Sequence, residues 1–268
     1  MKQNICVIGC GWLGLPLAKH LIENGYHVNG STTSASKIVM LETEGVSPFI
    51  VQLTSEGVVG SITSCLAHCK TLILNIPPGL RKDPKGNYVQ KIEHLITHIE
   101  SSEIKQVLFI GSTSVFADAT SIPIINETSP TARSINAKQL VAVEALFQKN
   151  KNFKTTILRF GGLFAEDRHP AKFLSCKTDL KNPDAPVNLI HRKDCIGIIV
   201  SILKHQTWNT VFNASTTPHP TRKNYYTTVC ESLQIPIPHF EFKQKSEGKI
   251  INSEKLVRLL NYKFKVKL

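Results

Sequence analysis

With 268 residues, 41% of them hydrophobic, the chain is long enough to bury a sizeable core, which excludes a disordered or collagen-like protein. Thirty-two Lys and Arg against 20 Asp and Glu give a formal net charge of +12, a balance that suits anionic partners such as nucleotides. No apolar run reaches the roughly 18 residues of a membrane-spanning helix, so no membrane association is expected.

The first 30 residues predict a strand, a turn and a helix, followed by a second strand. A short β-branched run, Asn4–Ile8, leads directly into Gly-Cys-Gly-Trp-Leu-Gly at 9–14. Apolar residues then recur at helical spacing through Leu17 and Leu21, and Asn24-Gly25 is typical of a helix end. A second strand is expected to begin over 26–29, which completes a βαβ unit.

Further short apolar runs predict buried parallel strands at 48–53, 71–76, 106–110, 155–159 and 210–214. Helical patterns lie between most of them, the clearest over 89–99 and 141–146, and a short helix is expected after Glu254. This alternation predicts an α/β fold, a Rossmann doubly wound parallel sheet with a small C-terminal substrate lobe. Because the alternation loosens and prolines gather after Leu163, we expect a Rossmann domain at 1–163 and the smaller lobe at 164–268, interleaved with the last strand near 210–214.

The glycines at 9, 11 and 14 stand between a strand and an amphipathic helix, the context in which Gly-x-Gly-x-x-Gly binds a dinucleotide. Gly9 would permit the tight turn, Gly11 would let backbone amides approach the pyrophosphate, and Gly14 would let helix and strand pack closely. With Trp12 and Leu13 they form the predicted phosphate-binding segment. A glycine-rich turn that binds nothing is the alternative.

The segment after the second strand bears on the choice of cofactor. NAD-binding members of this fold usually place a carboxylate there to hold the adenosine ribose 2′-hydroxyl, and none occurs here between Glu23 and Glu42. The segment instead carries hydroxyl groups and one cation, at Ser31, Thr32, Thr33 and Lys37. These groups can bind a 2′-phosphate, which favours NADP over NAD. A plain polar loop is the alternative.

The seven cysteines form no Cys-x-x-Cys pair and no zinc spacing, so no metal site is predicted. Cys65, His68 and Cys69 fall within one or two helical turns, but no second ligand cluster completes a tetrahedral site, which favours a partly buried helix face. An odd number of cysteines in a chain of this length indicates a reducing compartment, and a cytoplasmic location is expected.

Three segments stand in a specific order and spacing: Gly-Ser-Thr-Ser-Val-Phe at 111–116, Leu-Arg-Phe-Gly-Gly-Leu-Phe at 158–164 and Val-Asn-Leu-Ile-His-Arg-Lys-Asp at 187–194. They resemble segments of the extended short-chain dehydrogenase/reductases, the nucleotide-sugar epimerase and dehydratase group. Residues 111–116 look like the Ser/Thr-rich end of that group's fifth strand, 158–164 like the next strand and its turn, and 187–194 like the segment after the substrate loop. Segments 75–79, 168–170 and 248–251 are similar to a bacterial branch of atypical members. The resemblance covers nearly the whole chain. It implies an NAD(P)-dependent oxidoreductase or epimerase/dehydratase acting on a nucleotide-linked sugar, cofactor contacts at Ile76, Pro77 and Pro78, and a homodimer through a four-helix interface.

The chain departs from that group at the Tyr-x-x-x-Lys motif, in which the lysine lowers the tyrosine pKa for proton exchange with the substrate. No tyrosine here is followed by Lys at that spacing; by register Lys138 takes the lysine position and Ser134 the tyrosine position. A serine hydroxyl is too weak an acid to replace the phenol. The catalytic candidates are therefore Ser112, which matches the residue that binds the substrate oxygen, Ser114, where dehydratases carry an acid, and Lys138, for the ribose hydroxyls. Ordinary strand-end serines and a solvated helix lysine are the alternatives.

Arg168, His169 and His191 are the predicted substrate-binding residues. His191 and Asp194 suggest an acid/base pair, although we expect Asp194 to cap the following helix and His191 to line the cleft or satisfy a local hydrogen bond. The alternative to an enzyme is a catalytically inactive NAD(P)-binding regulatory or sensor protein, which accounts directly for the missing tyrosine. Nucleic-acid binding is not expected, since no basic helix or aromatic-rich sheet motif focuses the charge.

Overall fold

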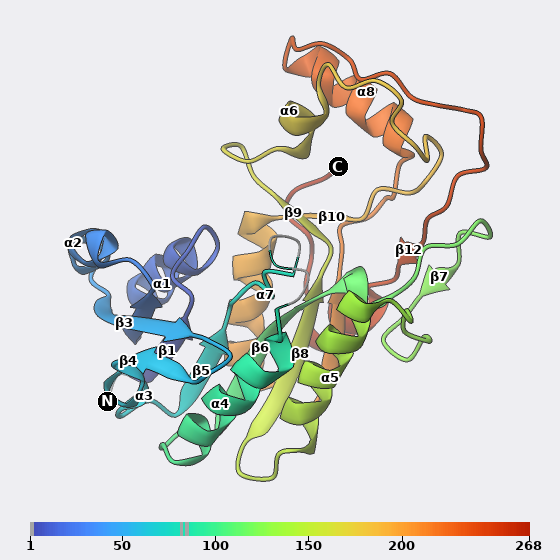
Figure 1. The fold of residues 1–268 in the computed structure, drawn as a ribbon. Helices are drawn as coiled ribbons and strands as arrows, with labels where there is room; N and C mark the ends of the chain where they lie inside the picture. Colours follow the sequence, from blue (N-terminus) through green and yellow to red (C-terminus); the bar gives the residue numbers. More distant parts are fainter. Residues whose placement is uncertain (1–2, 81–82, 84–85) are drawn as a thin grey trace. The chain divides into compact units, whose positions relative to one another are not determined.

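The computed structural model describes residues 3–80, 83 and 86–268, and over these residues it confirms the expected α/β fold of the Rossmann type. Its centre is an eight-stranded sheet of described residues with the order β11-β8-β6-β5-β1-β2-β3-β4 (Figure 1). The strands are β1 (Asn4–Ile8), β2 (His27–Thr32), β3 (Ser47–Leu53), β4 (Val58–Gly60), β5 (Thr71–Leu74), β6 (Gln106–Ser112), β8 (Lys154–Phe160) and β11 (Val211–Ala214).

The order of the strands fixes where a ligand can bind. Strand β1 lies between β2 and β5 and runs parallel to both, β3 and β6 continue the sheet in parallel on either side, and β4 pairs antiparallel with β3. The chain thus proceeds outward from β1 to β3 and returns to the other side of β1, so the topological switch point lies between β1 and β5. Ligands of doubly wound sheets bind at that point, beyond the carboxyl ends of the strands.

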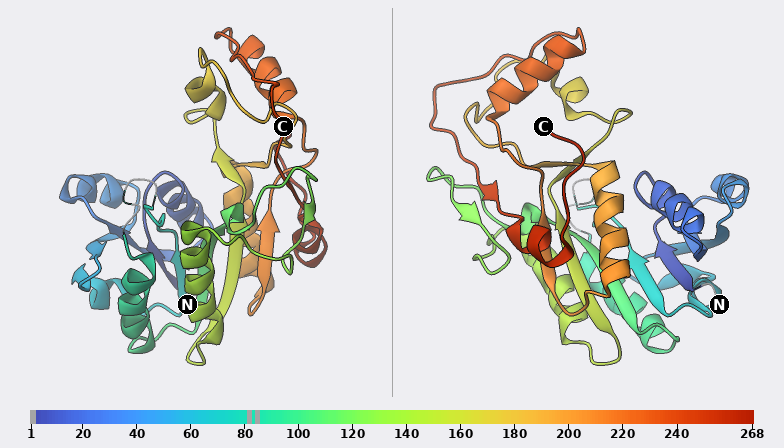
Figure 2. Two further views of the ribbon diagram at one scale, coloured as in Figure 1. Left: turned by 45° about the vertical axis from the view of Figure 1, so that its right-hand side comes forward. Right: turned by 180° about the vertical axis from the view of Figure 1, so that it is seen from behind.

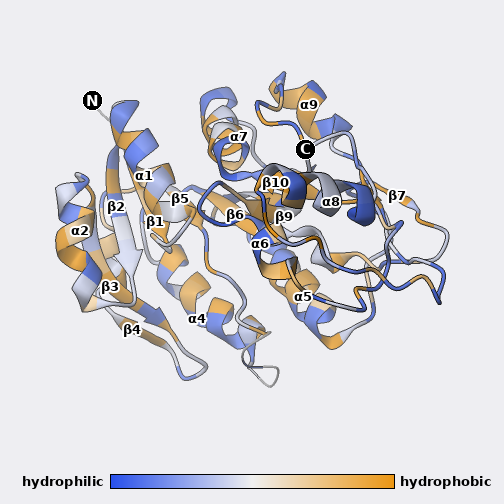
Figure 3. Ribbon diagram, turned by 90° about the horizontal axis from the view of Figure 1, so that it is seen from above, coloured by the Kyte–Doolittle hydropathy of each residue, from blue (hydrophilic) through white to orange (hydrophobic). Residues whose placement is uncertain are grey.

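Buried apolar residues hold helices against this sheet. Helix α1 (Gly14–Glu23) buries Leu17 and Leu21, one turn apart, and α4 (Tyr88–Glu100) buries Ile92 and three other residues of one face. Figure 3 shows apolar and polar bands alternating along α4. In α5 (Ile135–Lys149), Phe147 stacks on Phe109 of β6 with ring centroids 5.1 Å apart. Each such buried side chain contributes about 1.5–3 kcal/mol to folding.

Helices α4 and α5 lie side by side (Figures 1 and 2). The other helical segments of this region are η1 (Ala35–Lys37), α2 (Ile38–Thr43), α3 (Ile62–Leu66) and η2 (Thr113–Val115). In the described part of the chain, no helix is long and apolar enough to cross a membrane, and no three or more His, Cys, Asp or Glu residues gather as metal ligands would.

The chain divides into two compact units, each built from three segments. Unit 1 comprises Met1–Val115, Arg133–Leu158 and Ile202–Val211; unit 2 comprises Phe116–Ala132, Arg159–Ser201 and Phe212–Leu268. The lobes expected at 1–163 and 164–268 stay a prediction, and the compact units follow different segments. The division passes through β8, β11 and α7 (Arg192–His205).

Unit 2 contains two short parallel pairs, β9 (Gly162–Phe164) with β10 (Leu189–His191), and β7 (Ile124–Ile125) with β12 (Ile250–Ile251). Its helices besides α7 are α6 (Pro170–Leu174), α8 (Arg222–Ser232) and α9 (Glu254–Leu260), the last of which confirms the helix expected after Glu254. A core cluster joins β9, β10, α6 and α8, and Val266 and Leu268 of the C-terminal segment pack against it. Its buried members are Phe164, Ala171, Val187, Leu189, Tyr225, Tyr226 and Cys230.

The C-terminal segment is fixed by one buried carboxylate. Asp194, fully buried in the first turn of α7, accepts hydrogen bonds from the Tyr262 hydroxyl at 2.9 Å and from the backbone N–H groups of Lys265 and Val266 at 2.7 and 3.1 Å. The prediction that Asp194 caps α7 was therefore wrong. His191, at the residue before the helix, accepts the Lys193 N–H instead, which leaves the carboxylate of Asp194 to the C-terminal segment.

Candidate functional site

The glycine turn of unit 1 follows β1 at the switch point of the sheet. Gly9 has φ +103°, a conformation that L side chains rarely adopt, and a Cβ there would lie 2.3 Å from the Asn75 carbonyl oxygen. A Cβ at Gly14 would lie 2.1 Å from the Gly9 carbonyl oxygen. These two glycines are therefore required by the protein's own packing.

Gly11 differs, because a Cβ added there meets no described atom within 4 Å and its φ is not in the positive range. The turn at Gly11 thus opens onto free space. Nothing in the described structure requires a glycine at this position, whereas a pyrophosphate that approaches the backbone closely would.

The hydrogen bonds of the turn show which amides remain for a ligand. The N–H groups of Gly9, Cys10 and Gly11 donate to the Ser31 Oγ, the Ser31 carbonyl and the Gly9 carbonyl at 3.0, 2.8 and 2.8 Å. No acceptor for the N–H groups of Leu13 and Gly14 occurs among the residues that the structure describes.

The start of α1 suits an anion. It has no acidic residue in its first turn and no side-chain cap. An uncapped helix start with free amides and the positive end of the helix dipole fits the pyrophosphate of a dinucleotide. Trp12, half-buried, precedes these amides in the turn.

The residues predicted to hold the 2′-phosphate fall into two groups. Ser31 and Thr32 are the last residues of β2 and are 2% and 7% exposed; the Ser31 hydroxyl accepts the Gly9 N–H, and the Thr32 hydroxyl accepts the Ser34 N–H. Thr33 and Lys37 are exposed. Their direct contact with a cofactor stays a prediction.

On the other side of β1, the segment after β5 carries the remaining cofactor candidates. Ile76 and Pro78 are half-buried and Pro77 is exposed. The buried Tyr88 at the start of α4 donates its hydroxyl hydrogen bond to the Ile76 carbonyl at 3.4 Å. This contact anchors the segment beside the turn, since Asn75 also donates its side-chain amide to the Gly9 carbonyl at 3.2 Å.

Two predicted catalytic serines contact each other at the end of β6. The Oγ of Ser112 accepts hydrogen bonds from the Ser114 hydroxyl at 2.8 Å and from the Ser114 N–H at 3.1 Å. Because both bonds point toward the Ser112 oxygen, its own proton is left to donate to a third atom. The arrangement can donate a hydrogen bond to a substrate oxygen.

Ser134, which the resemblance assigns to the tyrosine position, has a structural use. Ser134 is the N-cap of α5, where its hydroxyl accepts the Ala137 N–H at 3.3 Å. Lys138, one turn later, is exposed, and its backbone N–H donates to the Ser134 carbonyl. A cap is the ordinary role of serine at a helix start.

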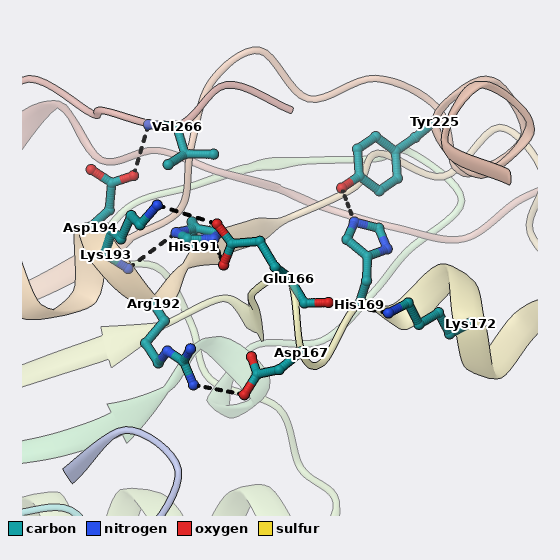
Figure 4. A network of polar contacts seen from close by, with 10 residues as sticks. All are labelled: Glu166, Asp167, His169, Lys172, His191, Arg192, Lys193, Asp194, Tyr225 and Val266. Carbon is teal, nitrogen blue, oxygen red and sulfur yellow. Dashed lines mark hydrogen bonds and ion pairs between the residues drawn. The ribbon is translucent and has the colours of Figure 1, made fainter. Parts of the chain in front are cut away.

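Two of the predicted substrate-binding residues, His169 and His191, contact the ring of Phe164 in unit 2, and Figure 4 shows their polar partners. His169 and His191 both face Phe164 edge-on, with ring centroids 5.3 and 5.0 Å apart. Each accepts a backbone N–H through Nδ1, His169 from Ala171 and His191 from Lys193, and so caps α6 or α7. In the neutral ring this leaves the proton on Nε2.

The Nε2 atoms meet different partners. That of His191 lies 3.3 Å from the Glu166 carboxylate, which also pairs with Lys193 at 3.2 Å. Hydrogen bonding to its own backbone N–H and to Lys193, together with the nearby His191, lowers the pKa of Glu166 to about 2. Beside this pair, Asp167 and Arg192 form an ion pair at 3.0 Å.

His169 Nε2 lies 3.1 Å from the Tyr225 hydroxyl of α8. Burial, and then the charges of Lys172 and His191, lower the pKa of His169, so the ring is neutral near pH 7. Burial raises the pKa of Tyr225, so that its phenol stays protonated. Arg168 is exposed and closes a tight turn with Ala165 through two backbone hydrogen bonds.

The sequence analysis gave no role to three residues of these sites, namely Asn75, Glu166 and Tyr225. Asn75 falls within the strand predicted at 71–76, whereas the observed β5 ends at Leu74 and leaves Asn75 just beyond the strand, at the switch point. No local pattern marks Glu166 or Tyr225, because their partners lie 25 and 56 residues away in the chain.

Comparisons with known proteins agree with this geometry. Residues 4–127 match the family model of the NAD binding domain of 6-phosphogluconate dehydrogenase. Protein YeeZ of Escherichia coli (strain K12) is 28% identical over 269 residues, which cover 98% of this chain and 96% of that protein.

Solved structures superpose over nearly the whole chain. UDP-glucuronic acid 4-epimerase from Bacillus cereus, in complex with NAD, gives a TM-score of 0.79 at 16% identity, covering 99% of this chain and 93% of that chain. UDP-glucose 4-epimerase from Thermotoga maritima, with UDP-glucose, gives 0.78 at 16% identity, covering 99% and 94%. A functionally unknown conserved protein from Silicibacter pomeroyi DSS also gives 0.78 at 16% identity, covering 100% and 95%. The chain therefore shares the fold of these epimerase and epimerase/dehydratase structures, and its residues 4–127 resemble an NAD binding domain.

Proposed function

We propose that the chain binds a nicotinamide dinucleotide at the turn 9–14 and acts as an NADP-dependent oxidoreductase or epimerase/dehydratase on a nucleotide-linked sugar. The observation that carries the proposal is the turn itself, which opens onto free space at Gly11 and leaves the Leu13 and Gly14 amides without described acceptors. The NAD complex of one similar structure and the UDP-glucose complex of another support the two ligand classes.

The cofactor would supply hydride transfer, and the chain's own groups would bind and orient. The Leu13 and Gly14 amides and the start of α1 hold the pyrophosphate. Exposed Thr33 and Lys37, with no carboxylate in their segment, favour NADP. Ser112 donates a hydrogen bond to the reacting oxygen, and Lys138 binds the ribose hydroxyls.

The second candidate function is an NAD(P)-binding regulatory or sensor protein without catalysis. It is favoured by Ser134, which occupies the place of the catalytic tyrosine as a helix cap and offers no phenol. Turnover decides between the two: an enzyme converts a member of a panel of UDP-sugars in the presence of NADP or NAD, whereas a sensor binds the cofactor and converts none.

Calorimetric titration with NADPH and NADH tests binding, with Gly11→Ala and Gly14→Ala as matched variants. Gly11→Ala should fold as stably as the natural chain but lose cofactor binding, because its methyl group occupies only the ligand's space. Gly14→Ala should lose stability, because its methyl group meets the Gly9 carbonyl. Unchanged cofactor affinity in Gly11→Ala, or no binding by the natural chain, contradicts the proposal.

Two further parts of the proposal concern assembly and location. The adjacent helices α4 and α5 are the pair that a four-helix homodimer interface would use, and sedimentation at several concentrations tests it. The seven cysteines, all free thiols, agree with a cytoplasmic location, which fractionation of cells tests.

A further inference from the structure

Gly9 is held by side chains from both neighbours of β1. From β2, the Ser31 Oγ accepts the Gly9 N–H at 3.0 Å. From the end of β5, the Asn75 Nδ2 donates to the Gly9 carbonyl at 3.2 Å. Both backbone groups of Gly9, its N–H and its carbonyl, are therefore hydrogen-bonded to a side chain, one from each strand adjacent to β1.

The strand ends do not depend on these two side chains. The backbone of Asn75 donates to the Ile8 carbonyl at 2.9 Å, and the backbone of Ser31 accepts from Cys10 at 2.8 Å. The backbone hydrogen bonds between β1, β2 and β5 therefore do not require the Ser31 hydroxyl or the side-chain amide of Asn75. The hydrogen bonds of the Ser31 and Asn75 side chains described above are made to Gly9. Gly9 has a φ of +103° and no side chain of its own to stabilise that conformation.

The Leu13 and Gly14 amides, proposed above to bind the pyrophosphate, lie a few residues beyond Gly9. The Gly9 carbonyl also accepts the Gly11 N–H at 2.8 Å, and the Gly11 carbonyl accepts the Leu15 N–H at 3.0 Å. A chain of backbone hydrogen bonds thus runs from Gly9 to the start of α1. These bonds connect Gly9 to the segment that contains the Leu13 and Gly14 amides.

We infer that Ser31 and Asn75 are positioning residues, which hold the Gly9 peptide groups so that the Leu13 and Gly14 amides are preorganised for a pyrophosphate. The inference rests on the proposed binding of a dinucleotide. It assigns Ser31 a role shared by NADP and NAD, because the pyrophosphate is common to both. Recognition of the 2′-phosphate is then left to exposed residues such as Lys37.

The ratio of the NADPH and NADH affinities separates a role at the shared pyrophosphate from direct contact with the 2′-phosphate. Calorimetric titrations with NADPH and NADH compare the natural chain with Ser31→Ala, Asn75→Asp and Lys37→Ala. Loss of one hydrogen bond should weaken binding about 3- to 10-fold. Ser31→Ala and Asn75→Asp should weaken both cofactors by the same factor, whereas Lys37→Ala should weaken NADPH alone.

Two variants control for the chemistry of the substitutions. Ser102→Ala removes a hydroxyl that accepts the Ile104 N–H at 3.2 Å, and Asn29→Asp removes an amide that donates to the Cys65 carbonyl at 3.0 Å. Both remove the same kind of bond elsewhere in unit 1 and should leave both affinities unchanged.

Hydrogen exchange of the Gly9 amide gives a readout that needs no cofactor. It should become faster in Ser31→Ala and stay unchanged in Ser102→Ala. The inference is overturned if Ser31→Ala weakens only NADPH, if Ser31→Ala and Asn75→Asp bind both cofactors normally, or if Gly9 exchange is unaffected. Absence of binding in the natural chain would instead remove the proposed function, and the inference with it.

Discussion

Replacing Asp194 with alanine should detach the C-terminal segment from unit 2. The substitution removes three hydrogen bonds to a fully buried carboxylate, from the Tyr262 hydroxyl and from two backbone N–H groups. A bond to a charged acceptor contributes about 1.5–3 kcal/mol. Because the freed end of the chain can regain water, the free energy of unfolding should fall by about 2–4 kcal/mol rather than by the sum of three bonds.

Urea denaturation measures this change, and hydrogen exchange of the Lys265 and Val266 amides shows where it arises. Asp118→Ala is the matched control, because the Asp118 carboxylate pairs with Lys249 at 2.8 Å but is 56% exposed. An exposed pair of this kind should contribute below about 1 kcal/mol. If Asp194→Ala were as stable as Asp118→Ala, or if the two amides stayed protected, the assigned role of Asp194 would be refuted.

Three further predictions concern unit 2. Gly197→Ala should lower the stability of unit 2 by about 1–3 kcal/mol, because the new Cβ would lie 2.4 Å from the Tyr262 hydroxyl oxygen. In a double-mutant cycle, Tyr262→Phe should recover part of this lost stability. Strictly additive effects of the two substitutions would disprove the contact. His169 has a pKa below its usual 6.5, so the folded state favours the neutral ring, and stability should fall as the pH drops from 6.5 through the lowered pKa. His169→Asn keeps an acceptor for the Ala171 N–H and should lose less stability than the natural chain between pH 7 and 5 in urea titrations. Equal losses in the two proteins would argue against the lowered pKa. Glu166 has a pKa lowered from 4.5 to about 2, so its contribution to stability should be complete above pH 4.5 and disappear as the pH falls through 2. In acid unfolding, Glu166→Gln should lose less stability than the natural chain over that pH range, by a modest margin because the carboxylate is 70% exposed. A larger loss in Glu166→Gln would contradict the lowered pKa of Glu166.

The sequence predicts the features of this fold that depend on neighbouring residues. Strand β1 and helix α1 follow from local apolar periodicity, and the tight turn between them follows from its glycines. The partners of Asp194 could not be predicted, because they lie 68 to 72 residues further along the chain. Its place near a helix start suggested a cap, while the tertiary structure gave that role to His191.

Ser31 illustrates the same limit in unit 1. A hydroxyl in a polar segment predicts an exposed ligand, and Thr33 and Lys37 are exposed as expected. Strand β2, however, continues through Ser31 to Thr32. Its pairing with β1 brings the Ser31 hydroxyl within hydrogen-bonding distance of the Gly9 N–H. Such a contact depends on how far a strand extends, which periodicity defines least well.

The interleaving of the two units has a consequence for how this chain can be divided or recombined. Six segments alternate between the units along the sequence. No single breakpoint separates them, because a fragment that stops at Leu158 already contains the unit 2 segment Phe116–Ala132 and lacks the unit 1 segment Ile202–Val211. Unit 2 could not be exchanged for that of a relative by swapping one terminal half. The exchange would require three separate segments, 116–132, 159–201 and 212–268.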